Sequence, residues 1–241
     1  MTSDQKLNQP TTLQRATSGR LGGISWRALL AQDVRAGALP GLVLVGLLVA
    51  AFIGQWFIGG PEQLGLSRQA VSEGRWLTLA THAVTHGGHL HLWMNSAAIL
   101  SMTLPVRLLV GSGAEGWWRY LSLLVGAAIL SAAMFLLIHP NDGIPMVGAS
   151  GAICGLWGLL VRSDLETRRL RPLLSKPVMI GMGEFAITNG VLFAILFFAA
   201  RSTGSQGGLA WEAHLGGFLF GLLLAPLFVR RLSLSEPAAT S

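Results

Sequence analysis

The feature that most constrains this chain is a series of long apolar segments separated by short polar stretches. The first segment covers residues 36–60 and contains no charged side chain. At about 1.5 Å per residue, a helix of roughly 20 apolar residues crosses the hydrocarbon core of a bilayer. The sequence therefore predicts an all-α membrane protein built as a six-helix bundle. The predicted spans cover residues 36–60, 90–110, 117–138, 150–162, 178–200 and 209–230.

The composition agrees with a membrane protein and excludes other classes. Only 12% of the 241 residues are charged and 51% are hydrophobic, whereas an average soluble domain has roughly 25% charged residues. The apolar content also excludes disorder for the main body of the chain. The formal net charge is +6, which we assign to cytoplasmic loops rather than to nucleic-acid binding. The one cysteine, Cys154, cannot form an internal disulfide.

The chain divides into one membrane domain and two polar ends. Residues 1–36 lack hydrophobic periodicity and predict a flexible cytoplasmic tail. Residues 37–231 form the six-helix domain, and residues 232–241 form a short second cytoplasmic tail. The expected location is therefore a membrane, crossed several times, and it is the plasma membrane if the source is bacterial.

Lysine and arginine counts predict the orientation of the spans. With both termini inside, 14 basic residues lie on the inner side and three on the outer side, as the positive-inside rule requires. The inner residues are Lys6, Arg15, Arg20, Arg27, Arg35, Arg107, Arg119, Arg162, Arg168, Arg169, Arg171, Lys176, Arg230 and Arg231. The outer residues are Arg68, Arg75 and Arg201.

The fourth predicted span is the exception in length. Residues 150–162 are too few to cross the bilayer alone, so their first residue must lie inside the membrane, shielded by protein. That residue is Ser150, between Gly148 and Gly151. A span that begins below the membrane surface is where we expect chemistry.

Polar side chains on three spans lie at similar predicted depths. Counted along each span from its cytoplasmic basic residue, Ser150 and Asn95 are both 12 residues away, about 18 Å of helix. His91 and His214 are both 16 residues away, about 24 Å. All four therefore lie in the outer half of the bilayer.

Glycines predict close packing between the fourth and sixth spans. Small residues let two transmembrane backbones approach closely, and they occur on the fourth span and one turn after His214 on the sixth. These glycines are Gly151, Gly155, Gly217 and Gly221. Their packing would bring Ser150 to His214.

The chemistry that this set predicts is acyl transfer. A serine hydroxyl becomes a nucleophile when a neutral histidine takes its proton, and the resulting oxyanion needs preorganised donors. The Ser150 backbone N–H, the Asn95 amide and the His91 ring are the candidate donors. No transmembrane aspartate lies beside His214 in the sequence, which favours a dyad over a triad.

On these motifs the sequence resembles the rhomboid family of intramembrane serine proteases, over about residues 40–230. The motifs occur in the family's order: His86, then His91 and Asn95 as H-x-x-x-N, then G-A-S-G at 148–151 and A-H-x-x-G-x-x-x-G at 213–221. The resemblance implies a serine endopeptidase with a Ser150–His214 dyad, assisted at the oxyanion by His91 and Asn95. Its cavity would open to the outer side, and its substrates would be transmembrane proteins cut in or next to their membrane helices. It would use no cofactor, and substrate would enter beside the fifth span.

Two residues are expected close behind the reacting groups. His86 precedes the second span, and Cys154 lies one turn after Ser150. At the position of Cys154, many rhomboids have an aromatic residue that stacks on the catalytic histidine. Cys154 is a small apolar residue instead.

Other functions remain as alternatives. A catalytically weak or inactive rhomboid-like protein would bind transmembrane clients, although such proteins normally lack the serine or the histidine, and both are present here. A transporter would use intramembrane Glu184, Asn189 and His214 as a pathway, although no inverted repeat is apparent. The oligomeric state is not predicted.

A zinc site is the last alternative. Four histidines occur within ten residues, but the sequence has no H-E-x-x-H motif. We therefore predict no metal. The histidines are His82, His86, His89 and His91.

Overall fold

The computed structural model describes residues 20–21, 24–25, 34–111, 113–139, 144–203 and 208–229. The predicted tail at residues 232–241 lies outside the described residues, as does most of the tail at residues 1–36. Within the latter, strands β1 (Arg20–Leu21) and β2 (Ile24–Ser25) form an antiparallel pair.

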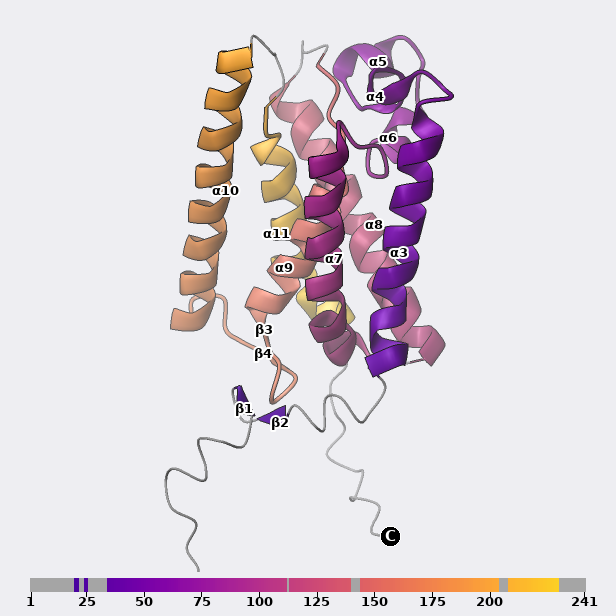
Figure 1. The fold of residues 1–241 in the computed structure, drawn as a ribbon. Coiled ribbons are helices and arrows are strands. Elements are labelled where there is room, and N and C mark those ends of the chain that lie inside the picture. Colours follow the sequence, from indigo (N-terminus) through magenta and orange to yellow (C-terminus); the bar gives the residue numbers. More distant parts are fainter. Residues whose placement is uncertain are drawn as a thin grey trace, which may run out of the picture.

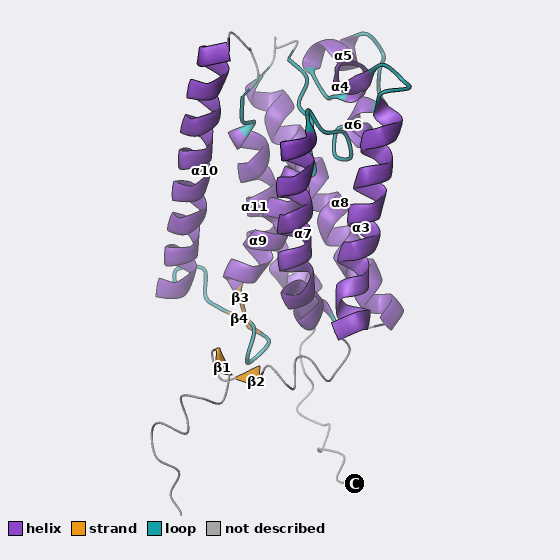
Figure 2. Cartoon of the chain, viewed as in Figure 1, coloured by secondary structure: helices purple, strands orange, loops and turns teal. Residues whose placement is uncertain are grey.

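The described chain is almost entirely helical (Figure 2). Five of its helices are long and apolar enough to cross a membrane, and a sixth, α9 (Ser150–Arg162), has 13 residues. The predicted all-α membrane fold is confirmed, with a short helix at the predicted place. The five long helices are α3 (Val34–Gln55), α7 (His89–Val110), α8 (Gly113–Ile138), α10 (Lys176–Thr203) and α11 (Trp211–Phe228).

Three short helices lie between α3 and α7 at one end of the bundle (Figure 1). They are α4 (Gly60–Leu64), α5 (Arg68–Ser72) and α6 (Thr78–Thr81). Leu66 in this region exchanges two backbone hydrogen bonds with Met146, of 2.9 and 2.7 Å. This pair fixes the segment that leads into α9. At the opposite end, β3 (Ser163–Asp164) and β4 (Arg169–Leu170) form a hairpin between α9 and α10.

Helix α9 lies in the interior of the bundle. Helix α11 packs mainly against α9 and α8, and α3 packs against α7. Leu156 and Leu159 of α9 are fully buried with Tyr120 of α8. By contrast, α10 lies at one side of the bundle, where almost none of its length is buried (Figure 1).

Glycines set the distance between α9 and α11. A Cβ atom added to Gly217 would collide with the carbonyl oxygen of Gly151, and one added to Gly221 would collide with that of Gly155. The two backbones are therefore in direct contact, with no side chain between them. This is the close packing that small residues allow between membrane helices.

Gly217→Ala is expected to destabilise the protein. The added methyl group has no space beside the carbonyl of Gly151, and overpacking of this kind costs about 1–3 kcal/mol. We expect a lower midpoint of thermal unfolding in detergent. The matched control is Gly46→Ala in α3, where no atom lies within 4 Å of the added carbon. Equal midpoints for the two variants would contradict the account.

Candidate active site

The segment before α9 places Ser150 at the first turn of the helix. Gly148 has a φ of 120°, a left-handed backbone conformation that favours glycine. Its N–H donates to the carbonyl of His82 over 2.8 Å. The chain then enters α9 at Ser150. Backbone N–H groups in the first turn of a helix have no intrahelical partner, so that of Ser150 is available to a ligand.

Ser150 and His214 lie within hydrogen-bonding distance, although 64 residues separate them. The Ser150 Oγ atom is 2.7 Å from the His214 Nε2 atom. His214 is in the first turns of α11 and is 6% exposed. The contact between α9 and α11 thus brings a hydroxyl group to a ring nitrogen able to take its proton.

His91 and Asn95 of α7 lie next to Gly148, two residues before Ser150. A Cβ atom on Gly148 would be 2.6 Å from the His91 Cε1 and Nε2 atoms and 3.4 Å from the Asn95 Nδ2 atom. Only glycine leaves room for both side chains at this position. The imidazole ring and the amide therefore face the start of α9.

His86 binds Asn95 directly. The Asn95 Nδ2 atom lies 2.9 Å from His86 Nε2, and His86 Nδ1 lies 3.2 Å from the Val84 carbonyl oxygen. A carbonyl only accepts, so the Nδ1 atom carries the proton of the neutral ring and Nε2 accepts from the Asn95 amide. The amide has a second hydrogen, and Asn95 itself lines the cavity described below.

Gln55, at the end of α3, holds His86 in place. Its side chain accepts from the His86 N–H over 3.0 Å and donates to the His86 carbonyl over 2.8 Å. Gln55 is 1% exposed. Both backbone groups of the buried His86 are therefore satisfied, as burial requires.

A cavity of about 720 Å³ contains the site. Its walls include Ser150, His214, His91 and Asn95, together with residues of α8 and α10. Ser131 of α8 also lines it and donates to the Ala213 carbonyl over 2.5 Å. Neither Ser131 nor Gln55 belongs to a motif, so the sequence did not predict that they lie at the site.

Asn189 of α10 is the most important residue that the sequence analysis left out of the site. Its Oδ1 atom lies 2.6 Å from His214 Nδ1. The depth count could have found it, because Asn189 is 189 − 176 = 13 residues from Lys176, close to the 12 for Ser150. Cys154, placed behind the reacting groups by its position in the sequence, is buried with Phe185 and Phe218.

The histidines near α7 do not form a metal cluster. Among the described residues, no group of three or more His, Cys, Asp or Glu side chains is arranged to hold a metal ion. The ring of His82 is 3.0 Å from the Thr78 carbonyl oxygen, and His89 packs edge-on against Phe52.

Comparisons with known proteins agree with these motifs. The family model described as "Rhomboid domain" matches residues 73–231, which is more than half of the chain. Over 147 residues, 56% of this chain, the sequence is 32% identical to "Rhomboid protease GluP" of Bacillus subtilis (strain 168). The matched part spans 27% of that relative's length.

The fold is expected to become less stable when the pH is lowered, because of His86. Burial, with a smaller effect from His91, lowers the pKa of His86 from 6.5 to about 4. Burial also lowers the pKa of His82. Between these values the unfolded chain binds a proton that the folded His86 does not, so stability decreases as the pH falls from 6.5 towards about 4. Thermal unfolding midpoints at several pH values measure this dependence.

His86→Gln should reduce that pH dependence, since its side-chain carbonyl still accepts from Asn95 but does not titrate. The control His89→Gln changes an exposed histidine and should keep the dependence of the parent protein. Identical pH dependence in the parent and in His86→Gln would contradict the assignment.

Proposed function

The chain belongs to the rhomboid family, and from this premise we propose that it is an intramembrane serine endopeptidase. It hydrolyses peptide bonds in or next to transmembrane helices of other membrane proteins. The observation that carries the proposal is the 2.7 Å contact between Ser150 Oγ and His214 Nε2, inside a cavity of about 720 Å³.

In the first step Ser150 attacks the substrate. The Ser150 hydroxyl gives its proton to His214 Nε2 while Oγ forms a bond to the carbonyl carbon of the scissile peptide. The carbonyl oxygen becomes an oxyanion. His214 then donates the proton to the nitrogen of the leaving amine as the C–N bond breaks, which leaves an acyl group on Ser150.

The oxyanion is stabilised by donors that surround the start of α9. They are the Ser150 backbone N–H, the free hydrogen of the Asn95 amide and the His91 ring. Asn95 is already fixed by its bond to His86, so little reorganisation is needed when the charge develops. Loss of one such donor typically costs about 10²–10³ in rate.

In the second step water releases the product. His214 takes a proton from a water molecule, whose oxygen attacks the acyl carbon. The Ser150 Oγ–carbon bond then breaks, Oγ recovers the proton from His214, and the product leaves as a carboxylic acid. In both steps the protons move only between Ser150, His214, the leaving amine and water.

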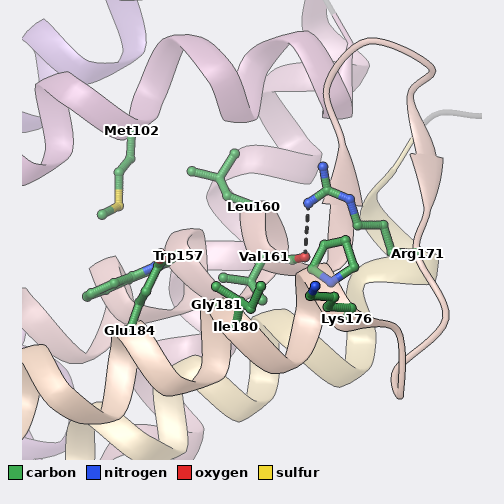
Figure 3. Close-up of a pocket in the computed structure, with 10 residues that line it drawn as sticks. Met102, Trp157, Leu160, Val161, Arg171, Lys176, Ile180, Gly181 and Glu184 are labelled. Carbon is green, nitrogen blue, oxygen red and sulfur yellow. Dashed lines mark hydrogen bonds between the residues drawn. The ribbon is translucent and has the colours of Figure 1, made fainter. Parts of the chain in front are cut away.

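Substrate helices enter beside α10. This helix packs against α9 and α11, and its Leu192 and Leu196 line the cavity of Ser150, as do His91 and Met94 of α7. A separate groove of about 580 Å³ lies beside the first turns of α10, towards the proposed cytoplasmic end. In Figure 3, Met102 of α7 lies on one side of the groove, with Ile180 and Glu184 of α10 on the other. We therefore assign the space between α7 and α10 as the side from which a transmembrane substrate approaches.

The proposed topology places both termini in the cytoplasm, and the plasma membrane as the location in a bacterium. At the described positions, inner basic residues such as Arg162 and Arg171 lie at the end of the bundle where α10 begins. Arg68 and Arg75 lie at the end that carries α4, α5 and α6. The partners are then transmembrane substrates and lipid, without nucleic acid.

Ser150→Ala and His214→Ala are each expected to abolish cleavage of a transmembrane substrate reconstituted in liposomes. The first removes the nucleophile and the second removes the base. The matched control is Ser101→Ala, which removes an exposed hydroxyl of α7 bonded to the Ala98 carbonyl and should leave cleavage unchanged. Cleavage by the Ser150→Ala variant would refute the mechanism. If the parent protein also failed to cleave the substrate, the client-binding alternative would be favoured.

The topology is testable by cysteine labelling in intact cells. In a Cys154→Ala background, Ser72→Cys in α5 is expected to react with a membrane-impermeant maleimide added outside. Glu166→Cys, in the β3–β4 hairpin, should react only after the cells are permeabilised. Both positions are exposed, so accessibility depends on the side of the membrane. The reverse pattern would invert the proposed orientation.

A further inference from the structure

We propose that Asn189 of α10 is a positioning residue for His214, so that the site works as a chain of Ser150, His214 and Asn189. The inference rests on the serine protease function proposed above. The contact that carries it is the 2.6 Å distance between Asn189 Oδ1 and His214 Nδ1. It continues the 2.7 Å contact between His214 Nε2 and Ser150 Oγ on the other side of the ring.

The direction of the Asn189 amide is fixed by a second bond. Its Nδ2 atom lies 2.9 Å from the carbonyl oxygen of Phe185, one turn earlier in α10. A carbonyl oxygen only accepts, so Nδ2 must be the atom that faces it. The oxygen Oδ1 is therefore the atom that faces His214.

This direction determines the tautomer of His214. An amide oxygen only accepts, so Nδ1 of His214 must carry a proton and donate it to Asn189. In the neutral ring Nε2 then has the free electron pair, and it can accept from the Ser150 hydroxyl. The tautomer that Asn189 selects is the one that a general base for Ser150 requires.

Asn189 also helps after proton transfer. When His214 takes the proton of Ser150, its ring becomes a cation, and the Nδ1–H bond donates more strongly to the amide oxygen. The amide has no accessible protonation of its own at neutral pH, so the proton stays on His214 for delivery to the leaving amine. Asn189 thus orients and stabilises the imidazolium without taking a proton.

The contact accounts for how the ring is held although Cys154 stands where many rhomboids have an aromatic residue. Cys154 is buried among Val178, Phe185 and Phe218. The aromatic rings beside Cys154 are Phe185 of α10 and Phe218 of α11, which stack with ring centroids 3.9 Å apart.

Because of the contact between Asn189 and His214, the orientation of the His214 ring depends on the position of α10. Val178, Phe185 and Asn189 are seven and four residues apart and share one face of α10. The first two are buried, whereas Ile187 and Val191 are exposed. Asn189 therefore reaches His214 only while this face of α10 lies against α9 and α11. A substrate that displaces α10 would also release the histidine until the helix returns.

The decisive variants are Asn189→Leu and Asn189→Asp. Leucine has a similar volume and suits a membrane helix, but it offers no acceptor. Aspartate keeps an acceptor oxygen at the same distance from the backbone. We expect Asn189→Leu to lower kcat about 10- to 100-fold with little change in KM, the range for losing one hydrogen bond to a charged group. Asn189→Asp should restore most of that rate. The control Ile187→Ala, on the exposed face, should behave as the parent.

A small fluorophosphonate probe separates positioning from substrate entry, because it reaches Ser150 without a transmembrane helix. The labelling rate of Asn189→Leu should fall in parallel with its kcat. An unchanged labelling rate, or a change confined to KM, would overturn the proposal. Failure of the parent protein to label would instead count against the serine protease function itself.

A measurement on the unmodified site covers the case in which Asn189→Leu does not fold. Nitrogen-15 NMR of histidine-labelled protein, with His214 assigned by its replacement, reports which ring nitrogen carries the proton. We expect Nδ1 at neutral pH. A proton on Nε2 would overturn the proposal.

Discussion

The direct contact between the backbones of α9 and α11 is the interaction on which the site depends. Gly217 and Gly221 lie against the carbonyl oxygens of Gly151 and Gly155, and no side chain fits between them. This approach brings Ser150, at the start of a helix too short to cross a membrane, to His214 on its neighbour. A side chain in place of Gly217 or Gly221 would push the two helices apart and disturb the contact between the hydroxyl and the ring.

Polar groups around the site occur in pairs that satisfy one another. Asn95 binds His86, whose backbone is held by Gln55, and Asn189 binds both the Phe185 carbonyl and His214. An unpaired polar group inside a membrane protein costs several kcal/mol. The pairing therefore stabilises the fold and at the same time fixes the direction of each donor and acceptor, which prepares the site for a developing charge.

The sequence predicted the helices and the motif residues, which depend on local pattern. It did not predict the site residues that are defined by contacts between distant parts of the chain. The apolar segments predicted the five long helices and the short α9 to within a few residues, because length and hydropathy are local properties. The motifs singled out Ser150 and His214. Asn189 was considered only as a transport residue, since its contact with His214 crosses 25 residues and follows no motif. Gln55 was missed because its partner, the backbone of His86, has no sequence signature.

The central claim is that Ser150 is a nucleophile activated by His214. The most direct test is peptide mass spectrometry of the purified protein after reaction with a fluorophosphonate. The account predicts a single adduct on the peptide that contains Ser150, and none in the His214→Ala variant. An adduct on another residue, or an equal yield without His214, would contradict it.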